Sequence, residues 1–392
     1  MKRLFLLPLA LLAACHSDTK PTATAIAPPA GSRAPAPASA GLADSPGASY
    51  RIYRGLLPGT TDSLTLHLVQ SPANPGDTEL NGTYASYADA SGQPFQLVRR
   101  LSAPDSLVLE DISYEHLTDS HSGPTWKLHQ QGAFLTGTIA SQPVRLHEAQ
   151  PAGSIALRVR QFSDSVAAYP GSATTPYAHL ALQALLPAQA PTALTNNILH
   201  DLNGDTLATQ PVVKLEQQWA QWSRQLTSDY REDANSLRAE LKEEMPSYAL
   251  RYESQRAAYV LWNQGPLLSL GLYHYSFTGG AHGSYGTMVA TYNTRTGQRL
   301  RFADVFRPSA ETQLSPILER AVRRTLRIPA GEALDQTLFV KHMPVTHNFY
   351  LTSGGAVFVY TPYEIASYAQ GEIHVFVPIK ELNTVLLPPV SS

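Results

Sequence analysis

Apolar and polar positions alternate in short runs between residues 49 and 150, and clusters of turn residues separate these runs. An alternation of period two is typical of β-strands with one buried face, and short, evenly spaced strands indicate an antiparallel sheet. We therefore expect an all-β domain here, either a lipocalin-like barrel or an open meander or sandwich. The runs are Tyr50–Tyr53, Leu64–Val69, Leu80–Tyr84, Phe95–Val98, Leu107–Glu110, Trp126–Leu128 and Leu135–Ile139. Trp126 and Phe134 are expected in its core.

Helical periodicity appears between strands from residue 151 to residue 390. The predicted helices are Thr192–Leu202, Lys214–Glu244, Ala310–Leu326 and a closing turn at Ile379–Leu382. The predicted strands are Ile155–Phe162, Tyr177–Leu185, Tyr248–Trp262, Leu267–Phe277, Thr287–Tyr292, Arg299–Phe302, Asn348–Leu351, Ala356–Tyr360 and Ile373–Val377. Helices packed on an antiparallel sheet make this second domain, and the fold class of the whole chain, α+β.

The first fifteen residues have the features of a lipoprotein signal peptide. Two basic residues precede an apolar run that ends in Leu12-Ala13-Ala14-Cys15, which is similar to a bacterial lipobox. We expect Cys15 to be lipidated and to anchor the exported chain in a membrane. His16 follows the cysteine instead of aspartate, so in a cell with two membranes we expect the outer one. Residues 16–48, rich in Ala, Pro and Ser, are predicted to be a disordered tether.

The net charge and the cysteine count argue against several classes of function. The formal net charge is −2, with no basic field of the kind that binds nucleic acid. Cys15 is the only cysteine, so neither a disulfide nor a cysteine-ligated metal is expected. At 392 residues the chain is long enough for two hydrophobic cores, which must then supply its stability.

Two loops in the second domain carry the candidate binding residues. The first is rich in glycine, which permits close approach of backbone or ligand, and the second presents tyrosines beside a glutamate. The candidates are Gly279, Gly280, His282, Gly283 and Tyr285 in the first loop, with Pro362, Tyr363, Glu364 and Tyr368 in the second. The alternative is that these loops are conformational locks in which Glu364 accepts backbone hydrogen bonds.

Spaced motifs in a fixed order surround these loops. They are Thr278–Gly283, Tyr292-Asn293 with Thr296-Gly297, Asp304–Phe306, Asn348–Leu351, and Tyr363–Ala366 with Tyr368 and Gly371. In these motifs the chain resembles the C-terminal domain of lysozyme-sensing anti-sigma factors and the non-catalytic region of peptidoglycan deacetylases. The resemblance is strong over residues 265–388, weaker over 155–264 and absent before residue 150. It implies a module that recognises a lysozyme-like protein or a peptidoglycan-type glycan.

Catalytic and metal-binding patterns are weak by comparison. His274 and His282 flank the glycine-rich loop, but no ligand set with zinc spacing accompanies them. The Asp201–Asp205 segment departs from a calcium loop at its sixth and twelfth positions, so it is expected to end a helix. Glu364 has no second carboxylate placed by sequence for glycoside hydrolysis. We expect no catalytic residue, no metal and no cofactor.

These observations predict an exported lipoprotein of the cell envelope that recognises its ligand without catalysis. Two alternatives stay open at this point. One is an envelope hydrolase or deacetylase acting through His282 or Glu364. The other is a carrier that holds a small ligand in the N-terminal β domain.

Overall fold

The computed structural model describes residues 45–72, 82–103, 106–113, 123–173, 175–240 and 250–388. The predicted signal peptide with Cys15, the tether up to residue 44, and the end of the long helix predicted to reach Glu244 lie outside the described residues. No helix in the described ranges is long and apolar enough to cross a membrane.

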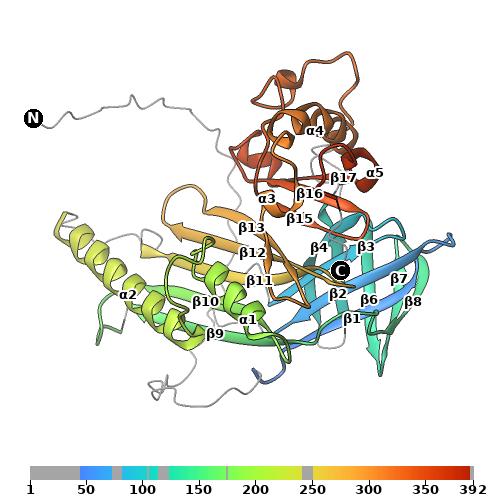
Figure 1. Cartoon of the computed structure of the whole chain (residues 1–392). Coiled ribbons are helices and arrows are strands. Elements are labelled where there is room, and N and C mark those ends of the chain that lie inside the picture. Colours follow the sequence, from blue (N-terminus) through green and yellow to red (C-terminus); the bar gives the residue numbers. More distant parts are fainter. Residues whose placement is uncertain are drawn as a thin grey trace, which may run out of the picture. The chain divides into compact units, whose positions relative to one another are not determined.

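Residues 49–148 form a closed antiparallel barrel, so the barrel alternative for the N-terminal domain is confirmed (Figure 1). Its strands are β1 (Ser49–Leu56), β2 (Ser63–Gln70), β3 (Thr83–Ala88), β4 (Pro94–Ala103), β5 (Ser106–Asp111), β6 (Thr125–Gln131), β7 (Phe134–Ile139) and β8 (Gln142–Glu148). Each strand pairs with the next, and β8 returns to pair with β1 through Glu148 opposite Tyr53. Strand β8 is an addition to the seven predicted runs.

Alternate side chains of every barrel strand point inward and fill the interior. Trp126, Leu64, Leu66 and Leu109 are fully buried there, so the prediction of Trp126 as core is confirmed. Phe134 is only half-buried, and the guanidinium carbon of Arg145 lies 3.9 Å from its ring centroid. The barrel axis is therefore occupied by core side chains, which leaves the interior ill-suited to the predicted carrier role.

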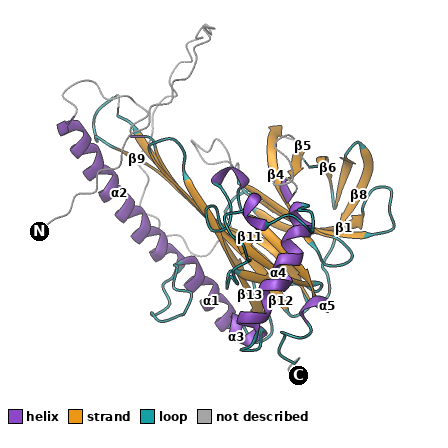
Figure 2. Ribbon diagram, turned by 90° about the horizontal axis from the view of Figure 1, so that it is seen from above, coloured by secondary structure: helices purple, strands orange, loops and turns teal. Residues whose placement is uncertain are grey.

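The second sheet has the strand order β14-β13-β12-β11-β10-β9. Its strands are β9 (Leu157–Ala167), β10 (Tyr177–Pro187), β11 (Tyr252–Gln264), β12 (Leu267–Thr278), β13 (Ser284–Asn293) and β14 (Arg299–Leu300). Neighbours run antiparallel except β10 and β11, which are parallel. Helices α1 (Thr192–Leu202) and α2 (Leu215–Glu240) connect this pair and lie on one side of the sheet (Figures 1 and 2).

The third sheet comprises β15 (Phe349–Leu351), β16 (Gly355–Tyr360) and β17 (Ile373–Pro378), and α4 (Ala310–Leu326) packs on it. The shorter helical segments are α3 (Phe302–Val305), η3 (Leu334–Gln336), η4 (Tyr368–Gln370) and α5 (Ile379–Leu382). Phe302 begins a helix, although the sequence pattern predicts it as the end of a strand. With this exception the predicted elements of the domain are present, and the α+β class is confirmed.

Strand β11 is buried on both faces, which explains its long apolar run. Ala258 and Val260 pack toward α1, whereas Tyr259 and Leu261 pack toward the third sheet. The outer surface of the barrel lies against the same strand, because the hydroxyl of Ser86 donates to the carbonyl of Val260 at 2.6 Å. The second sheet is therefore the layer on which the barrel and the third sheet are both positioned.

Candidate functional site

The glycine-rich loop connects β12 to β13 and is shorter than the sequence suggests. Gly279 and Gly280 have φ angles of 90° and 97°, a region that side chains other than glycine rarely adopt. His282 and Gly283 follow in the loop, whereas Tyr285 already belongs to β13. The loop thus ends before Tyr285, which was predicted to belong to it.

Gly283 is required by a close approach. A Cβ atom at this position would lie 2.4 Å from Cε2 of the Tyr275 ring, well inside van der Waals contact. The glycine therefore lets the loop fold down on the aromatic side chain of its own strand.

The second loop opens with a tight turn from Thr361 to Glu364. The amide of Glu364 donates to the carbonyl of Thr361 at 3.0 Å, and Pro362 and Tyr363 are the central residues. Tyr363 has a φ of 71°. Proline followed by a residue with positive φ is the pattern of a type II turn, in which the third position favours glycine or asparagine. A tyrosine is held here in a conformation that costs on the order of 1–2 kcal/mol.

Glu364 stabilises this turn. Its carboxylate accepts the amide of Thr361 at 3.0 Å, and the amide of Tyr363 donates to the carbonyl of Ala366 at 3.0 Å. The interpretation of Glu364 as a conformational lock therefore agrees with its contacts, although its side chain remains exposed to solvent.

Tyr368 joins the two loops. Its hydroxyl donates to the carbonyl of Gly283 at 2.8 Å, and its ring stacks on His282 with centroids 4.1 Å apart. The Nδ1 atom of His282 lies 2.9 Å from the same carbonyl. Residues about 85 positions apart in sequence, from the two loops that carry the predicted binding residues, thus form one surface.

The rings continue as a chain that we call the aromatic cluster, defined as Tyr273, His282, Tyr285, Tyr363 and Tyr368. The ring of Tyr285 meets that of Tyr368 edge-on, with centroids 5.4 Å apart. It is tilted against the ring of Tyr273, with centroids 6.1 Å apart. The ring centroids of Tyr363 and Tyr368 are 5.7 Å apart. At the inner end Tyr273 is partly buried, and this burial raises its pKa, with a further contribution from the charge of Glu372. At the outer end Tyr363 is 60% exposed.

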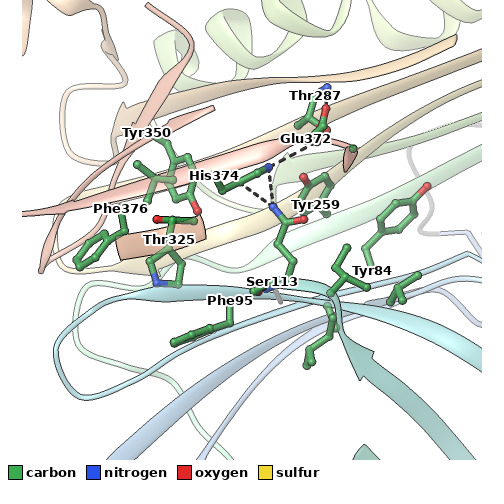
Figure 3. A pocket seen from close by; sticks show the side chains of 18 of the residues that line it. Tyr84, Phe95, Ser113, Tyr259, Thr287, Thr325, Tyr350, Glu372, His374 and Phe376 are labelled. Carbon is green, nitrogen blue, oxygen red and sulfur yellow. Dashed lines mark hydrogen bonds and ion pairs between the residues drawn. The ribbon is translucent and has the colours of Figure 1, made fainter. Parts of the chain in front are cut away.

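A cavity of about 510 Å³ adjoins the inner end of the cluster (Figure 3). It lies between β3 and β4 of the barrel on one side and β11, β13 and β17 on the other. Tyr273, Tyr285 and Gly371 belong both to its lining and to the surroundings of the cluster. Sequence analysis does not anticipate this cavity, because its walls come from segments as distant as Gln96 and His374.

The predicted helix-terminating turn at Asp201 is confirmed, because α1 ends at Leu202 and Asn203 is its C-cap residue. Asp201 is buried and accepts the Tyr292 hydroxyl at 2.6 Å, and Arg299 lies 2.9 Å away. Within the described part of the chain, no group of three or more His, Cys, Asp or Glu side chains is arranged to hold a metal ion.

Two family models match parts of the second domain. Residues 196–285 match the model described as Deacetylase PdaC, and residues 303–380 match the model described as Protein of unknown function (DUF3298). Both predicted loops lie in these ranges. A search of the curated proteins found no match.

Among the solved structures that match this chain are two from bacteria. A DUF3298 family member from Bacteroides fragilis NCTC 9343 aligns with a TM-score of 0.53 at 20% identity, covering 61% of this chain and 96% of that one. A DUF3298 family protein from Pseudomonas aeruginosa PAO1 aligns with a TM-score of 0.45 at 21% identity, covering 60% and 95%. The first likeness supports the fold over the 61% of this chain that it covers.

Together these matches support a domain of unknown function that is related to the non-catalytic region of deacetylases. The link to lysozyme-sensing anti-sigma factors stays a prediction. The matches point toward the cell envelope without naming a ligand.

Proposed function

We propose that this protein is an exported lipoprotein, anchored through Cys15, whose aromatic cluster recognises a peptidoglycan-type glycan without chemically altering it. Tyr363 and His282 would form the outer contact surface, with Tyr368 holding the two loops together.

The conformation of Tyr363 carries this proposal. An exposed aromatic ring contributes nothing to a hydrophobic core, and its left-handed backbone weakens the fold. Strain of this kind is retained where the surrounding structure fixes a residue for function. The Glu364 carboxylate and the neighbouring Tyr368 ring, tilted by 35° against that of Tyr363, supply that surrounding structure.

The chemistry of the cluster suits a sugar chain. Tyrosine rings offer an apolar face to the C–H groups of a sugar and a hydroxyl to its polar groups. Because Tyr363, Tyr368 and His282 are already locked, binding would cost little conformational entropy. The name of the matched deacetylase model agrees with this choice, since deacetylases of the kind that the sequence resembles act on wall glycan.

A lysozyme-like protein is the second candidate partner. The exposed carboxylate of Glu364 beside Tyr363 favours it, because an aromatic anchor next to an acid suits a basic surface. A lysozyme-like protein is nevertheless the weaker candidate, because the Glu364 carboxylate already accepts a hydrogen bond within the turn.

Catalysis is not part of the proposal. Glu364 is committed to the Thr361 amide, and His282 directs Nδ1 toward the neighbouring Gly283 carbonyl. In the part of the chain that the structure describes, neither side chain pairs with a group that would activate it as an acid or a base.

Co-sedimentation and calorimetry of the purified full-length chain would test this function. Insoluble wall glycan, soluble glycan fragments and lysozyme are offered in parallel, and glycan release is followed by mass spectrometry. We expect retention on glycan, saturable binding of fragments and no change in their mass. Binding of lysozyme alone would establish the second candidate instead. Binding of neither, or a turnover product, would refute the proposal.

A further inference from the structure

The cavity beside the aromatic cluster contains a carboxylate in an aromatic setting. Glu372 lies at one end of it, with the ring of Tyr259 close by and that of Tyr84 beyond (Figure 3). Tyr84 stacks on Tyr259 with centroids 5.6 Å apart and brings the barrel into the wall. Tyr350 and Phe376 line the remainder on the side of the third sheet. Tyrosine and phenylalanine rings therefore form a substantial part of the wall.

Glu372 is largely buried, with 11% of its side chain exposed. It accepts the backbone amide of Thr287, and Nε2 of His374 lies 3.5 Å from it. The amide nitrogen of Gln96 lies in turn 2.9 Å from the same His374 nitrogen. Within the described ranges of the chain, no lysine or arginine pairs with Glu372. Buried carboxylates are ordinarily matched by a cation, and among the described residues the ion-pair partner of Glu372 is His374, which carries charge only when protonated.

The charge of Glu372 is felt by the rings around it. Burial raises the pKa of Tyr259 and Tyr273, and the nearby carboxylate adds to the rise in both. The faces of these rings carry negative electrostatic potential of their own, which adds to that of the carboxylate. This end of the cavity thus disfavours an anion and favours a cation.

The arginines among the described residues that line the cavity lie at its other end. Arg324 and Arg327 flank Thr325, which lies on the far side from Glu372 in Figure 3. Arg324 pairs with Glu381 at 3.1 Å, and Arg327 is exposed at the end of α4. Neither of them neutralises Glu372.

We propose that this cavity binds a small organic cation, an ammonium group carried on an apolar body. The ammonium would pair with Glu372 and lie against the faces of the surrounding tyrosines, while the apolar body would contact Val98, Val357 and Phe376. The lining comes from both domains, so the ligand would bridge the barrel and the α+β domain. This site shares Tyr273 and Tyr285 with the aromatic cluster, but Tyr363 and His282, the outer surface proposed above to contact glycan, do not line it.

Three ligands of equal body and different charge test the proposal. They are 4-phenylbutylamine, 4-phenylbutanol and 4-phenylbutyrate, titrated into the full-length protein at pH 8, where histidines are ordinarily neutral. We expect the amine to bind about tenfold more tightly than the alcohol, and the carboxylate to bind weakest. Equal affinities, tightest binding of the carboxylate, or no binding of the amine at millimolar concentration would overturn the proposal.

Two variants locate the binding. Glu372→Gln keeps an acceptor for the Thr287 amide but removes the charge, so it should lower amine affinity about tenfold and leave the alcohol unchanged. Glu319→Gln, which removes a carboxylate paired with His342 outside the cavity, is the matched control. Val98→Trp fills the space and should abolish binding of amine and alcohol alike. Unchanged amine binding in either cavity variant would contradict the proposed site, and thermal unfolding verifies that each variant is folded.

Discussion

His67 illustrates how one residue joins the barrel to the second sheet. It is 2% exposed on β2, and its Nδ1 lies 2.9 Å from the hydroxyl of Tyr50. That hydroxyl also accepts the side-chain amide of Asn263 from β11 at 3.2 Å. Burial lowers the pKa of His67 from 6.5 to about 3, because a charged imidazole would be desolvated there.

This depressed pKa predicts a loss of stability in acid. Below pH 6.5 the unfolded chain binds a proton at this position that the folded chain refuses. The free energy of unfolding should therefore fall by about 1.4 kcal/mol per pH unit as the pH drops from 6.5 toward 3. Urea unfolding of His67→Gln between pH 7 and pH 4 should show a shallower decline than the wild type.

The exposed His342, paired with Glu319, provides the control for this experiment. His342→Gln should decline with the wild-type slope. If His67→Gln did so too, the burial of a neutral histidine would not be the cause of the acid sensitivity.

The site was only partly predictable at the residue scale. Glycines in a run and tyrosines after a proline identify two loops, and the structure brings those loops together through Tyr368. The role of Gly283 depends on the ring of Tyr275, and the burial of Glu372 depends on its three-dimensional neighbours. Neither leaves a local pattern, so the cavity could not be predicted.

At the scale of elements, β8 shows where periodicity alone failed. Val144 and Leu146 alternate inward as a strand requires, but the turn before them is Ala140-Ser141. Both residues have positive φ, at 48° and 68°, in a position where asparagine and glycine are the usual signal. The hairpin was missed because its turn residues are atypical.

The importance of β8 for the barrel can be measured. Leu146 is fully buried, so Leu146→Ala should lower the free energy of unfolding by about 2–5 kcal/mol. Leu207→Ala removes a leucine that is 68% exposed and should change it by less than about 0.5 kcal/mol. Chemical denaturation measures the free energy of unfolding of both variants and of the wild type. Equal effects would mean that the β8 face does not contribute to the core.

The parallel pairing of β10 with β11 is a second element that the pattern could not supply. Both strands were predicted, and so were the helices α1 and α2 between them. Strands β10 and β11 are parallel. In a parallel pair the chain must run back from the end of the first strand to the start of the second, which needs a long connection such as α1 and α2 provide. The helical connection can be predicted from the sequence, but the sequence pattern does not show which strand pairs with which.

For the whole molecule, the second sheet is the common support of the barrel and the third sheet. The barrel contacts it through Ser86, Tyr84 and Tyr50, and contacts the third sheet where Thr352 donates to the carbonyl of Gly92 at 2.7 Å. The cavity is formed at this junction and the aromatic cluster beside it. Recognition at the envelope, as proposed, would therefore depend on both domains keeping this arrangement.

The central claim is that Tyr363 is held in a strained turn for binding and not for stability. Tyr363→Gly separates the two roles, because glycine suits a φ of 71° better than tyrosine does. Tyr363→Phe keeps the ring, and Tyr177→Ala removes another exposed tyrosine as the control. Affinity for soluble wall-glycan fragments and the free energy of unfolding are measured on the same samples.

We predict that Tyr363→Gly leaves the free energy of unfolding unchanged or raises it by up to about 1 kcal/mol. Its affinity for glycan should fall at least tenfold, whereas Tyr363→Phe and Tyr177→Ala should bind nearly as the wild type does. Wild-type glycan affinity in Tyr363→Gly, or a marked loss of its stability, would contradict the account.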